Sequence, residues 1–195
     1  MKVKDVIKQV AIFLGLTNVM SANLDNFDNL DAQTKKDINL ILSSINEVLC
    51  DIATDYIFLE KEETIQVSNG SFSFSGLQEA FYKLIDVETQ KDYKLGFETL
   101  EIENGDYKIK YQYLPKIYQL ADTISGFERL TVYALCYGVA EEYCLISGNY
   151  SESEMWHSKF QNAMMIASKP NDVKVRTLKQ RRWIWKKLNI QKLLQ

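Results

Sequence analysis

The chain has 195 residues, of which 46% are hydrophobic and 25% are charged, so it is long enough for one domain with a substantial core. Its formal net charge is −3. The longest uncharged apolar run covers residues 130–140, far short of the roughly 20 residues of a membrane span, which argues against a membrane protein. Three cysteines (Cys50, Cys136 and Cys144) without a Cys-x-x-Cys pair argue against a disulfide framework and a zinc site, and predict buried, reduced thiols.

Two amphipathic helices are expected in the first 57 residues. Apolar residues recur at helical spacing from Val3 to Leu14, and Asp5 disfavours a signal peptide, so we expect a mature N-terminal helix and cytoplasmic synthesis. The second helix is predicted from an N-cap at Asp31 to about Tyr56.

The middle of the chain is predicted to form antiparallel strands. Residues 64–67 and 72–74 alternate polar and apolar side chains around Asn69-Gly70, a strong hairpin signal. The same alternation of polar and apolar residues occurs around Asn104-Gly105, in residues 100–102 and 107–111. Two further strands are predicted in residues 81–95.

A helical hairpin is predicted between residues 127 and 169. Its first helix is expected to stop at Gly148, because glycine after the last periodic residue can adopt a positive φ. Ser151 and Glu154 have the spacing of a capping box for the second helix, whose apolar stripe includes Trp156 and Phe160.

Together these elements predict an α+β, mainly α fold: a bundle of about four helices with an inserted antiparallel β-hairpin region and an extended C-terminal arm. We expect a single domain over residues 1–172, with helices in 1–57 and 127–169 and a β-rich insertion at 58–115. Residues 173–195 would form the basic arm.

The arm differs sharply in charge from the rest of the chain. It carries eight Lys and Arg residues and no Asp or Glu, which leaves 15 basic and 26 acidic side chains in residues 1–172, a net charge near −11. Such a segment can bind nucleic acid or an acidic protein surface, or can simply be solvated. Trp183 and Trp185 favour a partner over a solvated end, because exposed tryptophans usually need one.

Catalytic signatures are scarce. His157 is the single histidine, so any Ser-His-Asp or Cys-His relay would depend on it alone. The carboxylate pairs lack a partner motif and indicate solvated faces or charge lining the lumen of a ring; they are Glu62-Glu63, Glu141-Glu142 and Glu152 with Glu154. Neither a phosphate-binding loop nor an Asp-rich calcium loop is present in the sequence. We therefore expect that the protein is not an enzyme and that it has no catalytic residue, metal site or cofactor.

The order of motifs resembles a known family. The helical hairpin resembles that of the head-to-tail adaptor (connector) proteins of tailed bacteriophages, and the residues that carry this resemblance are Tyr137-Gly138, Ala140-Glu141, Gly148-Asn149-Tyr150, Trp156 and Phe160. Upstream, "YQYLP" from Tyr111 and "LADTI" from Leu120 are similar to the strand and link of that family. Downstream, Arg181-Arg182-Trp183-Ile184 is similar to its basic arm. The resemblance covers residues 111–184, and the N-terminal part only in general plan.

This resemblance implies a virion structural protein, assembled in the host bacterial cytoplasm, that forms a homo-oligomeric ring, commonly dodecameric, beneath the portal. Its partners would be the portal protein and a tail or second ring protein, with genomic DNA passing through without sequence-specific binding. The portal-docking residues implied in the arm are Lys174, Arg176, Lys179, Arg181, Arg182, Trp183, Trp185, Lys186 and Lys187.

Two alternatives remain. The first is a DNA-binding accessory protein whose tail holds phosphates and whose tryptophans stack on bases, although the acidic body would repel DNA. The second is a small scaffold or chaperone-like interaction protein, which the residues do not separate from an adaptor.

Overall fold

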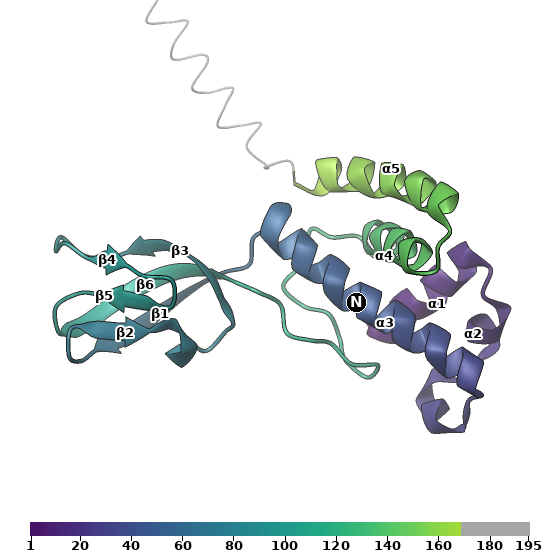
Figure 1. The fold of residues 1–195 in the computed structure, drawn as a ribbon, viewed down its shortest axis with the longest axis horizontal. Helices are drawn as coiled ribbons and strands as arrows, with labels where there is room; N and C mark the ends of the chain where they lie inside the picture. The colour runs from purple at the N-terminus through teal and green to yellow at the C-terminus, as the bar shows by residue number, and fades with distance from the viewer. Residues whose placement is uncertain (169–195) are drawn as a thin grey trace, which may run out of the picture.

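The computed structural model describes residues 1–168, which form a helical lobe and a β lobe lying end to end along the long axis and joined by two stretches of chain (Figure 1). The helices of the first lobe come from both sides of the β lobe in the sequence. In chain order the elements are α1 (Val3–Leu14), α2 (Thr17–Ser21), the 3-10 helix η1 (Leu24–Asn29), α3 (Ala32–Asp55), β1 (Glu60–Val67), β2 (Ser71–Ser73), the 3-10 helix η2 (Phe74–Gly76), β3 (Phe81–Val87), β4 (Lys94–Leu95), β5 (Thr99–Glu101), β6 (Gly105–Tyr113), α4 (Val132–Ile146) and α5 (Tyr150–Ala167).

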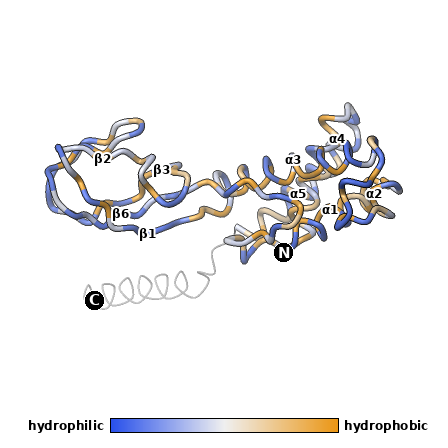
Figure 2. Tube along the Cα trace, turned by 90° about the horizontal axis from the view of Figure 1, so that it is seen from below, coloured by the Kyte–Doolittle hydropathy of each residue, from blue (hydrophilic) through white to orange (hydrophobic). Residues whose placement is uncertain are grey.

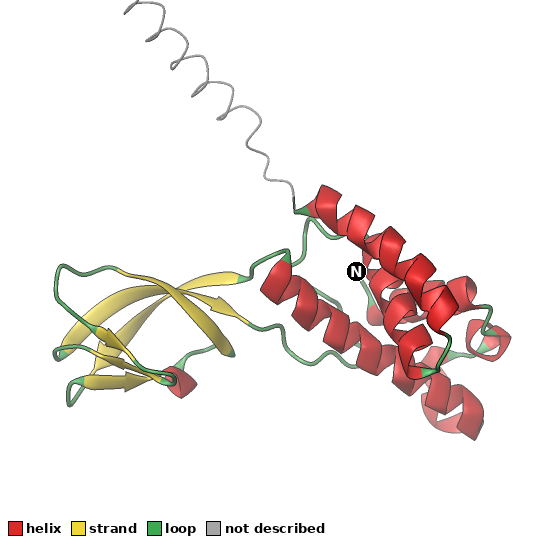
Figure 3. Ribbon diagram, turned by 45° about the horizontal axis from the view of Figure 1, so that its top comes forward, coloured by secondary structure: helices red, strands yellow, loops and turns green. Residues whose placement is uncertain are grey.

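The α+β, mainly helical fold class is confirmed. Figure 3 shows the strands confined to one lobe and the long helices to the other, and Figure 2 shows the same separation from below. The expected bundle of about four helices is not confirmed as such. Instead α4 is central: it packs against α1, α3 and α5.

The two N-terminal helices were predicted correctly. Val3, Val6, Ile7 and Val10 of α1 are fully buried. Asp31 is the N-cap of α3, where its carboxylate accepts a hydrogen bond from the backbone N–H of Thr34 over 3.0 Å. The short helices α2 and η1 between them were not predicted.

Two three-stranded antiparallel sheets build the β lobe, in the orders β1-β6-β3 and β2-β5-β4. They share a core that includes Phe74, Leu100, Ile109 and Tyr111. The hydroxyl of Tyr111 donates a hydrogen bond to Glu63 over 3.0 Å, and burial together with this carboxylate raises the pKa of Tyr111 to about 12.

Asn69-Gly70 forms a turn, whereas Asn104 lies at a bend and Gly105 begins β6, and the two hairpins predicted around these pairs are wrong. Asn69 and Gly70, at φ 58° and 72°, make the turn between β1 and β2, yet these strands belong to different sheets. Likewise β5 does not pair with β6, and β3 and β4 lie in different sheets. The consecutive strands β4 and β5 form a local hairpin, with Leu95 opposite Leu100, whereas the other strand pairs join segments far apart in the sequence.

The pairing register between β1 and β6 continues between β2 and β5, although the chain bends between the two sheets. Val67 lies opposite Gly105 in the first sheet, and Ser71 lies opposite Glu101 in the second. At the corner, the backbone N–H of Gly70 donates to Oδ1 of Asn104 over 2.7 Å. The two Asn-Gly pairs are therefore partners of each other, and the ribbon formed by β1, β2, β5 and β6 bends where they meet.

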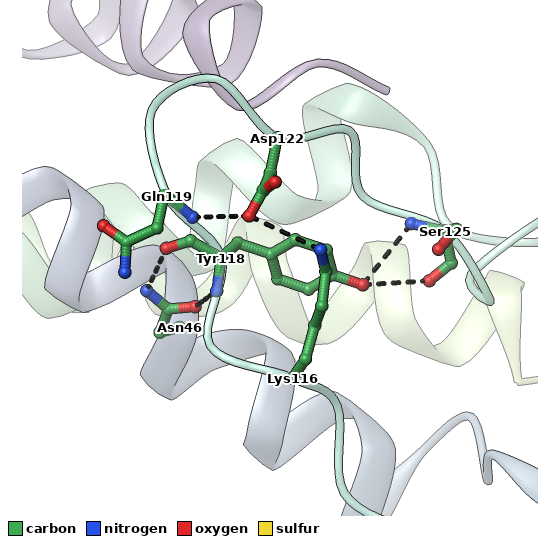
Figure 4. Close-up of polar contacts among 6 residues, drawn as sticks. All are labelled: Asn46, Lys116, Tyr118, Gln119, Asp122 and Ser125. Carbon is green, nitrogen blue, oxygen red and sulfur yellow. Dashed lines mark hydrogen bonds and ion pairs between the residues drawn. The ribbon is translucent and has the colours of Figure 1, made fainter. Parts of the chain in front are cut away.

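Asn46 of α3 anchors the chain as it returns from the β lobe to the helical lobe (Figure 4). Its Oδ1 accepts from the backbone N–H of Tyr118 over 2.7 Å, and its Nδ2 donates to the carbonyl of Tyr118 over 3.1 Å. The Tyr118 hydroxyl in turn donates to the Ser125 carbonyl over 3.2 Å. This loop then pairs with the start of the chain, where Lys2 bridges Thr123.

Candidate functional site

The portal-docking residues expected in the arm lie outside the described residues. These are Lys174, Arg176, Lys179, Arg181, Arg182, Trp183, Trp185, Lys186 and Lys187. The candidate surfaces of the described part are therefore sought around the α4–α5 hairpin, at the junction of the lobes and on the β lobe.

Gly148 ends α4 as predicted, with φ 79°. The backbone N–H of Asn149 reaches back to the carbonyl of Cys144 over 2.8 Å, and that of Gly148 to Leu145 over 3.1 Å. These bonds satisfy carbonyls at the end of α4 and require the left-handed conformation that glycine adopts without strain.

The capping box expected at Ser151 and Glu154 is not formed. The N-cap is Asn149, two residues earlier than the pattern suggested, and the helix begins at Tyr150, so Ser151 already lies inside it. Asn149 and Glu152 occupy the cap and third positions instead, and Nδ2 of Asn149 donates to Oε2 of Glu152 over 2.8 Å. Because Asn is as good a cap residue as Ser, the two alternatives could not be separated by residue type.

The hairpin is fixed to α1 by stacked aromatic rings. The ring of Trp156 lies 5.2 Å from that of Phe13 and 6.0 Å from that of Tyr137, with interplanar angles of 16° and 21°. Phe13 also stacks on Tyr137 at 5.5 Å. These contacts join α1, α4 and α5 into one packed unit.

A groove of about 200 Å³ lies between α3, α4 and α5, and we call it the acidic groove. Its carboxylates are Asp51 and Asp55 of α3 and Glu141 and Glu142 of α4. Burial and the charge of Asp55 raise the pKa of Asp51, and burial with neighbouring carboxylates raises the pKa of Glu142. The fold thus holds negative charges together at an energetic cost.

Sequence reasoning noticed Glu141 and Glu142 but missed Asp51 and Asp55. A usable signal was present, because two carboxylates four residues apart fall on one face of a helix, here in its last turns, where the helix dipole disfavours negative charge. No basic residue occupies the last turn of α3 to offset them.

A second cleft, of about 430 Å³, lies at the junction of the lobes and shares Tyr56 with the acidic groove. Ala167 and Ser168, at the end of α5, line this junction cleft beside Glu60, Glu128 and Arg129. The described chain therefore ends at the mouth of a cleft that adjoins the acidic groove.

A third cleft, of about 710 Å³, lies on the β lobe. Phe74 and Phe81 line it as a stacked pair with ring centroids 3.9 Å apart. Tyr82 and Phe97, both exposed, also line it, and 95% of the Phe97 side chain is accessible to solvent. So much aromatic surface in and beside an open cleft is typical of a contact site.

Histidine and cysteine, two residue types often used in catalysis, occur in the described part. His157 is exposed, and its Nδ1 lies 2.7 Å from Oε1 of Glu141. Burial raises the pKa of Cys136 to about 12 and that of Cys144 to about 11, so both are protonated thiols at neutral pH. Within residues 1–168, no three His, Cys, Asp or Glu side chains are placed to hold a metal ion, and no helix is both long and apolar enough to span a bilayer.

Comparison with known proteins gives no match: no protein-family model fits the chain, and no curated protein is significantly similar in sequence.

Proposed function

We propose that the protein is a structural protein of a tailed-bacteriophage virion that forms a ring at the portal–tail junction. There it extends the DNA channel and offers a docking surface for the tail. The order of motifs from Tyr111 to Ile184 is what suggests this family. The aromatic cleft of the β lobe is the observation that carries the proposal, because an assembly protein needs unpartnered apolar surface.

The two lobes suit the different contacts of a ring subunit. The helical lobe, with α4 at its centre, is a rigid body for lateral contacts, which close into a ring when the rotation per subunit divides a full turn. The β lobe extends away from it (Figure 1) and presents Phe97 for a neighbouring subunit or tail component. The acidic body would keep DNA from sticking to the channel wall.

The test is assembly with a portal. The isolated protein should sediment as a monomer at micromolar concentration and appear as a ring on portal particles in negative-stain images. Phe97→Ser should weaken ring formation without altering stability, since this side chain is exposed. Tyr93→Ser, which removes a 43% exposed aromatic side chain of the same lobe that does not line the cleft, is the matched control. A stable dimer that persists with the portal would contradict the proposal.

A second candidate is a DNA-binding accessory protein. It is favoured by the composition of residues 173–195, which carry eight cationic side chains and two tryptophans. Salt dependence separates the two candidates, as set out in the Discussion.

A further inference from the structure

We propose that the acidic groove between α3, α4 and α5 is a docking surface for the basic segment of the same chain, residues 173–195. This inference concerns a contact within one subunit and holds whether or not the protein forms a ring.

The charge of the groove calls for a cationic partner. Asp51, Asp55, Glu141 and Glu142 line it, and Glu47 acts on it from one turn earlier in α3. His157 also lines the groove, and its Nδ1 lies 2.7 Å from Oε1 of Glu141. Among the described residues that line the groove and the junction cleft, Arg129 is the one permanent cation.

Two helix ends add to this field. α3 ends at Asp55 and α5 ends at Ala167, and both ends border the junction cleft through Tyr56 and Ala167. Neither helix has a basic residue in its last turn. The C-terminus of a helix carries roughly half a negative charge, so both dipoles add to the carboxylates in attracting cations.

The basic segment matches this surface in sign. Its eight Lys and Arg residues are not interrupted by an Asp or Glu. The acidic groove also has an apolar floor, because Val48 and Phe160 line it. A segment that combines cations with tryptophans and aliphatic residues is complementary to acidic walls and an apolar floor.

The segment begins within reach of the groove. Ser168 lines the junction cleft, and Lys174 follows six residues later, a span of up to about 20 Å for an extended chain. Asp51 and Asp55 lie four residues apart on α3, or about 6 Å along the helix axis. Because a tethered segment meets its site at an effective concentration near the millimolar range, we assign the contact to the same chain rather than to a second copy.

Carbodiimide cross-linking of the full chain tests the contact directly, since it joins a carboxylate to a lysine amine in contact with it. An equal mixture of isotopically light and heavy protein should give peptides joining Asp51, Asp55 or Glu142 to Lys174, Lys179 or Lys186. These should occur as light–light and heavy–heavy pairs. Cross-links dominated by mixed pairs would mean that a second copy occupies the groove, and their absence would mean that the segment does not; either result overturns the proposal.

A groove variant supplies an independent readout. Asp51→Asn, Asp55→Asn and Glu142→Gln together should speed tryptic cleavage between residues 174 and 187 by about fivefold, because cleavage follows the undocked population. The matched control, Asp92→Asn, Glu98→Gln and Glu101→Gln, removes three exposed charges from the β lobe and should leave the rate unchanged. Equal rates in all three proteins would overturn the proposal. A thermal melt of the groove variant should show no loss of stability, so that faster cleavage cannot reflect unfolding.

Discussion

Gly138 of α4 faces Phe160 of α5 so closely that a Cβ at position 138 would lie 2.9 Å from Cε2 of the phenylalanine ring. The same Cβ would lie 2.8 Å from Cγ1 of Val48 on α3. The absence of a side chain at Gly138 thus lets the three helices that form the acidic groove approach one another.

Gly138→Ala should therefore destabilise the protein by about 1–2 kcal/mol, because the added methyl group overpacks a site between two stiff side chains. Alanine favours a helix by up to about 1 kcal/mol relative to glycine, so overpacking must exceed this gain. Ser158→Ala on the exposed face of α5 is the control and should change stability by less than about 0.5 kcal/mol. Urea denaturation measures both, and a stabilised Gly138→Ala variant would show that the helices can separate at little cost.

At Gly148 the penalty should come from the backbone alone. The φ angle is 79°, and a Cβ added to this residue would have nothing within 4 Å, so Gly148→Val should cost about 1–2 kcal/mol through strain in the left-handed region. Gly148→Asn is the matched control and should cost less, since asparagine tolerates this conformation. If valine and asparagine destabilise equally in denaturant melts, the strain explanation fails.

Asn46→Ala should loosen the return loop. The substitution leaves the backbone N–H and carbonyl of the buried Tyr118 without their partners, at a cost of about 1–3 kcal/mol. Amide hydrogen exchange at Tyr118 should accelerate at the same time. Asn46→Asp keeps the acceptor but loses the donor, so its effect should be intermediate. Unchanged exchange at Tyr118 in the alanine variant would show that packing alone holds the loop.

The raised pKa values of Asp51 and Glu142 predict a pH dependence of stability. A carboxylate whose pKa is higher in the folded state binds more protons there than in the unfolded chain. In the chain truncated after Asp172, which has no basic segment to dock in the acidic groove, these two groups should thus raise stability as pH falls from neutrality towards the usual carboxyl range. In that truncated chain, Asp51→Asn with Glu142→Gln should remove this trend in melts between pH 7 and about pH 5. If the truncated chain shows the same slope with and without the two substitutions, the prediction is refuted.

Salt dependence should separate protein docking from DNA binding by the arm. If Lys and Arg bind the phosphates of duplex DNA, the logarithm of the affinity should fall linearly with the logarithm of the salt concentration, with a slope of about −0.9 for each neutralised phosphate. Docking through Trp183 and Trp185 should keep much of its affinity for a portal at high salt, because apolar burial is not screened. Replacing both tryptophans with alanine should nearly abolish portal incorporation, as should truncation after Asp172. Normal incorporation of the double variant, with loss on neutralising the basic residues, would favour the DNA-binding candidate.

Local signals predicted elements well and pairings badly. The cap at Asp31 and the stop at Gly148 depend on neighbouring residues, and both appear where expected. Asn69-Gly70 predicted a turn correctly, but the pair does not specify which strand lies opposite the flanking residues. The pairing of Val67 with Gly105 depends on the core that the two sheets share. The residues of that core are far apart in the sequence, so a short stretch of sequence does not predict the pairing.

The candidate surfaces were equally hard to predict because they join distant segments. The acidic groove combines Asp51 with Glu142, which are brought together only by the packing of α3 against α4. The β-lobe cleft combines residues 73–82 with Phe97 and Glu98 across the two sheets. Charge counts predicted an acidic body but could not say where its charge gathers.

The discontinuous helical lobe has a consequence for synthesis on the ribosome. Val6 of α1 and Cys136 of α4 belong to one core, and the thiol of Cys136 points to the carbonyl of Val6 at 3.8 Å. All six strands are made between these helices, so the β lobe can fold first from a continuous stretch of chain. At a translation rate of roughly 5–20 residues per second, the apolar face of α1 lacks its packing partner α4 for a time on the order of ten seconds. Over that interval the nascent chain depends on chaperones or on transient contacts between α1 and α3.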